Sequence, residues 1–280
     1  MLMLFMNIRI KIKRVEFIPV LATLVLFLIF SSNVLADKYQ SNSSSDHAAE
    51  KNWSLTIGGG IANSSEFEGG GDRETSFVPF FSASYSYKNL TLNLDGLSYN
   101  FIDNKKILLS TGIGFDGGRD DDDLPPDRRG LGDANGGVEA KLFVRYQPFS
   151  EISLSLDATQ SFADSNGLTL TAAARTEFPL YREQVFGSIG VSANWANNDH
   201  MEAFFGVNAL QSVNSGLRQF GADSGVRDLI IEGDIVYLIN KNWILNFGGG
   251  FEFFLGDARD SPVIEEDIQP FVFGGLGYVF

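Results

Sequence analysis

The residues GGVEAKLFVRYQ (136–147), PFS (148–150) and EISLSLDATQSF (151–162) decide the fold of this chain. Apolar side chains occupy every second position of the first stretch, from Val138 to Tyr146, and most of the second stretch repeats the pattern. Successive side chains of a β-strand point to opposite faces of the sheet, so each stretch predicts a strand with one apolar face. The short connection between them predicts a β-hairpin.

The same alternation recurs along the chain from Trp53 to Phe280. It predicts eleven strands, mostly of 10–12 residues, at 52–62, 77–87, 90–101, 106–116, 136–147, 151–162, 168–178, 185–196, 227–239, 243–255 and 270–280. Polar or Gly/Asp/Asn-rich connections join them, and no helical period competes over more than a turn or two. The chain is therefore predicted to be all-β and built of sequential antiparallel hairpins.

Alternation alone does not separate a soluble barrel from a membrane barrel, and three further features favour the membrane. The predicted strands are longer than the usual five or six residues and match the roughly 9–11 that a tilted strand needs to cross a bilayer. The face assigned inward is mostly Ser, Thr, Gly, Asn and charged residues, which suits a wet lumen. Aromatic residues recur at strand ends, where interfacial girdles lie. These are Trp53, Tyr87, Tyr146, Phe178, Trp195, Tyr237 and Trp243.

The strand count poses a problem of parity. Single-chain bacterial barrels have even numbers of strands, with long loops outside and short turns in the periplasm. Counting back from the C-terminus places the segment 117–135 outside, whereas counting forward from Trp53 places it in the periplasm. Either Ala203–Gln211 is a twelfth strand or one predicted strand between 77 and 116 does not cross. We predict a transmembrane up-and-down barrel of about 12 strands, within a range of 10–12.

The N-terminus carries the pattern of a secretory signal peptide. Four basic residues between Arg9 and Arg14 precede an apolar stretch, and small residues end at Ala36. This order predicts residues 1–36 as a signal peptide cleaved after Ala36. The alternative is a membrane anchor, for which an apolar core of about 14 residues is marginal. Residues 37–51 predict a flexible polar leader, and residues 52–280 the barrel.

Composition excludes several functional classes. The 280 residues include 21 Lys and Arg against 35 Asp and Glu, so the formal net charge is −14. An acidic balance argues against nucleic acid as a partner. The absence of cysteine excludes disulfides, thiolate metal sites and a cysteine nucleophile, and two histidines leave little for imidazole chemistry. We predict that the protein binds no cofactor and is not an enzyme.

Two features of the sequence are candidates for chemistry. His200 is the one histidine placed for catalysis at a barrel rim, but its neighbour Asp199 points away from it in an extended chain, and no G-x-S-x-G elbow is present. A run of carboxylates could hold a divalent cation, yet it lacks the alternating spacing that wraps one ion, and a solvated loop is the expectation. That run is Asp120, Asp121, Asp122 and Asp123.

The lumen is predicted to carry charges from two strands. Glu139, Lys141 and Arg145 share one face of the fifth predicted strand, and Asp228, Glu232 and Asp234 share one face of the ninth. If the two strands face each other across the lumen, these charges pair and help plug it, or they bias a small pore. Both a plugged lumen and a conducting one stay open.

The last strand and four sequence blocks resemble known proteins. The chain ends on an alternating apolar strand whose Leu276, Tyr278 and Phe280 resemble the C-terminal signal read by the assembly machinery of bacterial outer-membrane barrels. Four blocks resemble the MipA/OmpV family of outer-membrane proteins. They are FFGVNALQSVNSGLRQF (204–220), DARDSPV (257–263), GGLGYVF (274–280) and Gly118-Arg119. The run of four aspartates departs from the family pattern.

The resemblance implies a Gram-negative outer-membrane location, with lipid and lipopolysaccharide around the barrel. It also implies a non-catalytic scaffold of the cell envelope that links a murein transglycosylase to a penicillin-binding protein that polymerises murein. The alternatives are a small-solute channel and an adhesin acting through the segments 117–135 and 197–226. No partner-binding residue can be transferred from the family, because no motif position defines one.

Overall fold

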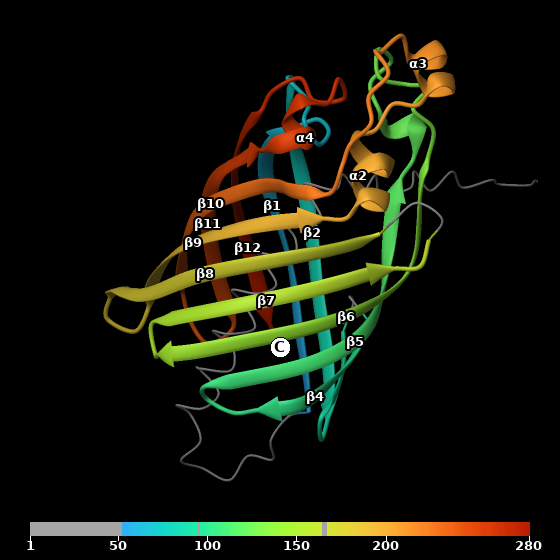
Figure 1. The fold of residues 1–280 in the computed structure, drawn as a ribbon. Helices are drawn as coiled ribbons and strands as arrows, with labels where there is room; N and C mark the ends of the chain where they lie inside the picture. Colours follow the sequence, from blue (N-terminus) through green and yellow to red (C-terminus); the bar gives the residue numbers. More distant parts are fainter. Residues whose placement is uncertain (1–51, 94–95, 164–166) are drawn as a thin grey trace, which may run out of the picture.

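The computed structural model describes residues 52–93, 96–163 and 167–280, which form a closed antiparallel barrel of twelve strands (Figure 1). Each strand pairs with its sequence neighbours, and β1 pairs with β12 to close the sheet. The strands are β1 Trp53–Ser65, β2 Arg73–Tyr87, β3 Leu90–Asn93, β4 Gly96–Asp103, β5 Ile107–Arg119, β6 Ala134–Phe149, β7 Ile152–Ser161, β8 Leu168–Tyr181, β9 Val185–Ala196, β10 Gly225–Leu238, β11 Trp243–Phe254 and β12 Ile268–Val279. The predicted signal peptide with its cleavage after Ala36 and the predicted leader at 37–51 lie outside the described residues.

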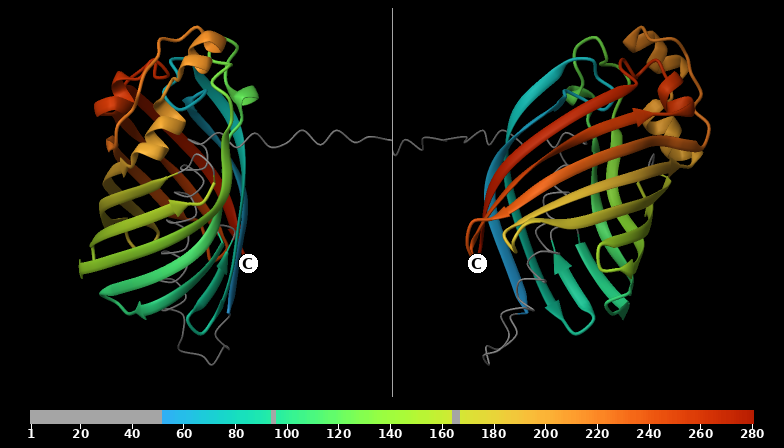
Figure 2. Two further views of the ribbon diagram at one scale, coloured as in Figure 1. Left: turned by 45° about the vertical axis from the view of Figure 1, so that its right-hand side comes forward. Right: turned by 90° about the vertical axis from the view of Figure 1, so that its left-hand side faces the viewer.

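The two ends of the barrel differ in the length of their connections (Figure 2). Short turns join strands at the end where β1 begins and β12 finishes, here called the turn end. Long connections lie at the other end, the loop end, and hold all the described helices. These are η1 Asp121–Asp123, α2 Asn198–Phe205, α3 Ala209–Ser215 and α4 Gly256–Asp260. No helix in the described ranges is long and apolar enough to cross a bilayer.

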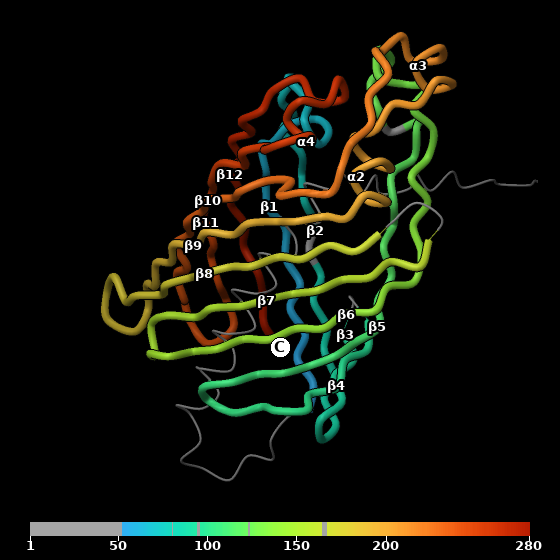
Figure 3. Tube along the Cα trace, in the orientation of Figure 1, coloured from blue at the N-terminus to red at the C-terminus, as the bar shows by residue number. Residues whose placement is uncertain are grey.

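The predicted number of twelve strands is confirmed, but the segment expected to supply the twelfth strand was wrong. Ala203–Gln211 is not a strand, because it contains the end of α2 and the start of α3. The extra strand comes from the segment 90–101, which turns back on itself and forms β3 and β4 (Figure 3). The two short strands restore even parity, so the connection from β5 to β6 lies at the loop end.

Asparagine side chains shape two of the tight turns. The Asn104 Oδ1 accepts the backbone N–H groups of Lys106 and Ile107 at 2.9 and 3.0 Å. The Asn240 Oδ1 accepts those of Asn242 and Trp243 at 2.9 and 3.0 Å. Such side-chain bonds replace the missing ladder partners of a turn, which explains why the alternating pattern stops at these asparagines.

Apolar side chains face outward and polar side chains face the lumen, as the alternation predicts. The outward set includes Ile61, Phe77 and Phe247, which are 63%, 71% and 62% exposed. The inward set includes buried Thr56, Ser188 and Asp234. A protein with this pattern needs an apolar solvent around its belt, because water would leave the whole band of exposed apolar groups unburied.

Candidate functional site

Four connections at the loop end pack around one hydrophobic cluster, here called the cap core. Its buried residues come one or two from each connection, and Leu217 and Phe220 pack against them. They are Phe67 after β1, Leu124 and Leu131 after β5, Val207 after β9 and Val263 after β11. A cluster drawn from four loops makes them one ordered unit, here called the cap, instead of four independent loops.

Helix α2 ties the cap into the barrel mouth. Its Met201 and Phe205 are each 1% exposed and pack with Ala196 and Phe254, which end β9 and β11. The rings of Phe205 and Phe254 lie 6.1 Å apart at an angle of 62°. Ala196 and Phe254 alternate with outward residues and therefore face the lumen, so α2 sits within the mouth.

Arg119, in the Gly-Arg pair of the predicted family blocks, holds the end of α2. Its guanidinium donates to the carbonyl oxygens of Phe204 and Ala203 at 3.3 and 3.4 Å and lies 5.6 Å from the centre of the Phe204 ring. The last carbonyls of a helix lack partners within the helix and carry partial negative charge, so a cation stabilises them. Gly118 precedes it with φ +72°, a conformation that favours glycine.

The helices of the connection after β9 begin at asparagines. The Asn197 side chain accepts the N–H of His200, and Asn208 forms a capping box with Gln211. The same Gln211 donates through Nε2 to the carbonyl oxygen of Leu131 at 2.5 Å, joining α3 to the connection after β5. Side-chain caps satisfy the first N–H groups of a helix, which explains why short helices form here.

A charged cluster lies beneath α2. The Arg227 guanidinium donates to Asp228 at 2.6 Å and lies 3.5 Å from Glu68. Asp228 is fully buried and also accepts from the Asn194 side chain. Each buried charge thus has a partner of opposite sign, which is the condition for keeping it out of water.

His200 completes this cluster, and among the described residues no carboxylate contacts its ring. Its Nε2 lies 3.2 Å from the Arg227 guanidinium, and its ring stacks on Phe204 at 4.5 Å. Burial, together with the positive charge of Arg227, lowers the pKa of His200 to about 3. The imidazole is therefore neutral at pH 7, and its Nε2, which would face the nucleophile in a catalytic triad, faces a cation instead.

The lumen charges pair with neighbours on the same part of the wall. Arg175 of β8 lies 2.5 Å from Asp234 and 3.7 Å from Glu232 of β10. On the other side, Lys141 lies 3.0 Å from Glu139 of the same strand. Glu139 and Lys141 of β6 thus pair with each other, and Glu232 and Asp234 of β10 lie beside Arg175 of β8.

Asp121, in the run of aspartates after β5, bonds within the loop itself. The Asp121 carboxylate accepts the N–H groups of Gly130 and Gly132, each at 2.9 Å, and the N–H of Asp121 donates to Asp133 at 2.8 Å. Asp120 and Asp122 are exposed. Within the described ranges no group of three His, Asp or Glu side chains is arranged to hold a metal ion.

The predicted interfacial aromatics divide between the two ends. Trp53, Tyr87, Tyr146, Tyr237 and Trp243 lie near the turn end with 39–55% of their surface exposed. Phe178 also lies in the half of β8 nearer that end, and Trp195 lies at the loop end of β9. Their seat at a membrane interface stays a prediction.

The C-terminal strand ends in an aromatic ladder. The Tyr278 ring packs edge-on against Trp243 at 5.1 Å and against Phe280 at 4.8 Å. The Phe280 N–H donates to the carbonyl oxygen of Leu55 at 3.0 Å, beyond the end of β12. Leu276 pairs with Gly59 across the closing seam of the barrel. The role of Leu276, Tyr278 and Phe280 as an assembly signal stays a prediction.

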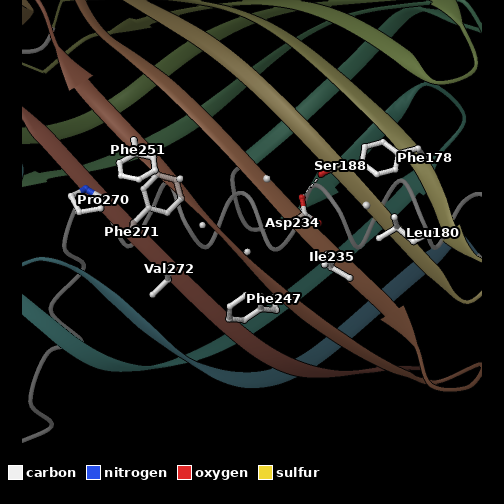
Figure 4. A pocket seen from close by; sticks show the side chains of 15 residues that line it. Phe178, Leu180, Ser188, Asp234, Ile235, Phe247, Phe251, Pro270, Phe271 and Val272 are labelled. Carbon is white, nitrogen blue, oxygen red and sulfur yellow. Dashed lines mark hydrogen bonds between the residues drawn. The ribbon is translucent and has the colours of Figure 1, made fainter.

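A shallow groove crosses the outer face over β9, β10 and β11 (Figure 4). Outward glycines Gly187, Gly233 and Gly249 form its floor, and Phe178, Phe247 and other apolar side chains border it. A Cβ on Gly187 would lie 2.7 Å from the Phe178 ring, so the aromatic ring covers the missing side chain. The groove belongs to the apolar outer wall.

Comparison with known proteins identifies the family. The family model described as "MltA-interacting protein MipA" matches residues 57–280. No curated protein matches the chain. Similar solved structures include the KdgM porin, with 12% identity over 80% of this chain and 99% of that chain and a TM-score of 0.41. Others are OmpT of Vibrio cholerae (7%, 81%, 98% and 0.43) and OprB of Pseudomonas putida (9%, 73%, 59% and 0.40). The chain belongs to the MipA family and is a β-barrel of the bacterial outer membrane.

Proposed function

We propose that this protein is a non-catalytic scaffold of the cell envelope, whose barrel is closed toward the outside and whose periplasmic turns bind murein enzymes. The observation that carries the proposal is the cap. In an outer-membrane barrel the long loops are extracellular, so the cap core and α2 lie over the outer mouth. Buried contacts among four loops disfavour a freely open pore and leave the periplasmic end as the working surface.

The charge distribution supports a periplasmic binding surface. The extracellular connections 66–72, 120–133, 197–224 and 255–267 carry 17 acidic and 4 basic residues. The periplasmic turns carry 5 basic residues, Lys88, Lys105, Lys106, Arg182 and Lys241, against Glu151 and Glu183. The periplasmic rim therefore favours a partner with an acidic face. The family is described by interaction with MltA, and the partner proposed here is a murein transglycosylase, joined by a murein-polymerising penicillin-binding protein.

The surroundings of His200 support a non-catalytic role. Its imidazole is packed between Phe204 and the Arg227 guanidinium, and within the described part of the chain no carboxylate contacts it. His200 thus acts in the cap as a neutral, buried packing group.

Site-directed photocrosslinking in intact cells tests the scaffold. A photoreactive residue at Ser150 or Lys241 lies in a periplasmic turn, and one at Val213, which is 81% exposed on α3, serves as the extracellular control. We expect the two turn positions to capture a murein hydrolase or synthase, and we expect Val213 to capture neither enzyme. Replacing Lys105 and Lys106 with glutamate should weaken that capture, because it reverses the charge of the rim.

Planar-bilayer recording tests the channel. We expect the purified barrel to show no sustained conductance, because the cap core closes the outer mouth. Steady conductance steps from the intact protein, together with absence of murein enzymes among the crosslinked products, would replace the scaffold with a small-solute channel.

A further inference from the structure

The wall of the barrel is incomplete on one side. Strand β2 pairs with β3 only over Ser84–Tyr87, and β5 pairs with β4 only over Leu108–Ile113. Within the described ranges, no strand pairs with the remaining edges, Arg73–Ala83 of β2 and Gly114–Arg119 of β5 (Figures 1 and 3). These two edges, above the short β3–β4 hairpin, are called the notch.

The register fixes which backbone groups face the notch. The Ser86 N–H donates to the carbonyl oxygen of Asn52, so even-numbered residues of β2 are bonded to β1. Odd-numbered residues from Thr75 to Ala83 consequently turn their backbone polar groups toward the notch. The Gln147 N–H donates to the carbonyl oxygen of Lys106, so even-numbered residues of β5 are bonded to β6. The backbone polar groups of Phe115 and Gly117 in β5 therefore face the notch.

The notch is too wide for β2 and β5 to close it directly at the level of the hairpin. The two intervening strands set β2 and β5 three strand spacings apart there, roughly 14 Å, against the roughly 4.8 Å of a hydrogen-bonded pair. From Ala83 to Phe77 the edge of β2 is about 20 Å long. Because the strands are tilted, this length spans about half of the height of the apolar band of an outer-membrane barrel.

The notch opens within the apolar band. Outward residues remain mainly apolar up to Phe77 on β2 and up to Phe115 on β5, and these two rings are 71% and 72% exposed. On the lumen side β2 presents Ser76 and Ser82, with the buried Val78 between them. The rim is therefore apolar toward the bilayer and carries two serine hydroxyls toward the lumen.

Pro79 lies in the middle of the β2 edge. It pairs with Gly59 on the β1 side, and its nitrogen, which carries no hydrogen, faces the notch. Proline is confined to strand edges because it cannot donate to a ladder, and it is one of the residues by which natural sheets block the addition of a further strand. The sequence of this edge thus disfavours a β-strand as its occupant.

Unpaired backbone groups at bilayer depth are tolerated only where they line a water-filled cavity or are buried in protein. We propose that the notch is a wet lateral opening between the lumen and the outer half of the bilayer, and that it admits an amphiphile with an acyl chain. The polar head lies against the serines and backbone groups of the rim, and the acyl chain extends past Phe77, Phe81 and Phe115 into the membrane. The cap makes this side opening the route by which the lumen communicates with the outer leaflet.

Single cysteines test the opening, since the chain has none of its own. Ser76→Cys places a thiol on the lumen face beside the notch, and Ser192→Cys places one on the lumen face of β9, which is paired on both sides. Each variant is reconstituted in phospholipid vesicles and treated with a long-chain N-alkyl maleimide, which partitions into lipid, or with a sulfonated maleimide, which reports water access.

We expect the ratio of alkyl to sulfonated labelling rates to be at least about tenfold higher at Ser76→Cys than at Ser192→Cys, because only the first site adjoins the bilayer through an opening. Equal ratios at the two sites would overturn the proposal. Phe77→Cys lies on the outer face beside the notch, and Phe247→Cys lies on the outer face of β11, which is paired on both sides. Both should react with the alkyl reagent.

Hydrogen–deuterium exchange of the unmodified protein gives a second test that does not depend on a variant folding. In vesicles we expect the N–H groups of Phe77 and Phe81 to exchange fast and those of Ser76 and Val78, bonded to β1, to exchange slowly. Residues 272–278 of β12, paired on both sides, are the reference. Slow exchange at Phe77 and Phe81 would mean that a strand, from a second copy or another protein, covers the edge, and would overturn the lateral opening.

Discussion

Arg119, the last residue of β5, donates a 3.3 Å hydrogen bond to the carbonyl oxygen of Phe204, one residue before the end of α2. This contact joins the barrel wall to the helix in its mouth, and the guanidinium is largely buried with the Phe204 ring beside it. The cap therefore depends on a charge-assisted contact as well as on its hydrophobic core.

Replacing Arg119 with alanine should release α2 while leaving the barrel folded. Two hydrogen bonds from a charged group contribute about 2 kcal/mol here, so the open fraction of the cap should rise by roughly thirtyfold. Protease cleavage in the connection 197–224 on intact cells measures it. Arg259→Ala is the control, because Arg259 is half exposed in its pair with Asp260 and its loss should leave the cleavage rate unchanged.

The cap should also loosen in acid through His200. Its pKa is about 3 in the folded cap and 6.5 when exposed, so the open form binds a proton that the closed form does not. Stability is fully present above pH 6.5 and falls by about 1.4 kcal/mol per pH unit between pH 6.5 and 3. Cleavage of the same connection should therefore rise between pH 7.5 and 5.

His200→Gln separates this effect from the titration of nearby carboxyl groups. Glutamine fills much of the same space and stays neutral, so the variant should keep a nearly flat cleavage rate over that pH window. A variant profile as steep as that of the parent protein would assign the acid sensitivity to other groups.

Gly118 and Gly117 form a matched pair for testing backbone strain beside Arg119. Gly118 has φ +72°, and a Cβ there would lie 2.2 Å from the carbonyl oxygen of Ala134, whereas a Cβ on Gly117 would meet nothing within 4 Å. Gly118→Ala should lower the free energy of unfolding by about 1–3 kcal/mol, and Gly117→Ala by less than about 0.5 kcal/mol. Guanidinium unfolding in detergent, followed by tryptophan fluorescence, measures both, and equal losses would remove the conformational explanation.

The strand pattern of this protein could be predicted from its sequence because each strand carries a local period of two. Val138–Tyr146 alternates residue by residue, and the structure places it in β6. The segment 90–101 alternates as well, yet it forms two antiparallel strands, β3 and β4. Alternation indicates which face of the sheet each side chain occupies, but it does not indicate where the chain reverses direction. The odd number of predicted strands is the feature of the sequence that points to a further strand.

The cap and the notch could not be predicted in this way. Phe67, Leu124, Leu131, Val207 and Val263 are spread over nearly 200 positions and follow no period, and only the closed barrel brings their loops together. Arg175 likewise contacts Asp234 across β9, although the two residues are 59 positions apart in the sequence. Family resemblance had singled out Gly118-Arg119, but the role of Arg119 at α2 follows from the structure alone.

The pair of Arg175 and Asp234 should be strongly coupled. The 2.5 Å contact lies on the lumen side, and the Asp234 side chain is 2% exposed while it also accepts from Ser188. Removing Arg175 leaves the buried Asp234 carboxylate without this cation, which costs about 3–5 kcal/mol, whereas Asp234→Asn leaves Arg175 beside Glu232. Arg175→Met should therefore destabilise the barrel strongly and Asp234→Asn less, and the double variant should lose much less than the sum of the two.

The pair of Lys141 and Glu139 gives the matched control. It also lies on the lumen side at 3.0 Å, but its side chains are 35% and 13% exposed. Water screens such a pair, so the coupling measured for Lys141→Met and Glu139→Gln should be below about 1 kcal/mol. Unfolding in detergent gives both double-mutant cycles. If the Arg175–Asp234 coupling were no larger than that of the control, water would have to reach both pairs equally, and Asp234 would not be the buried anchor of the lumen wall.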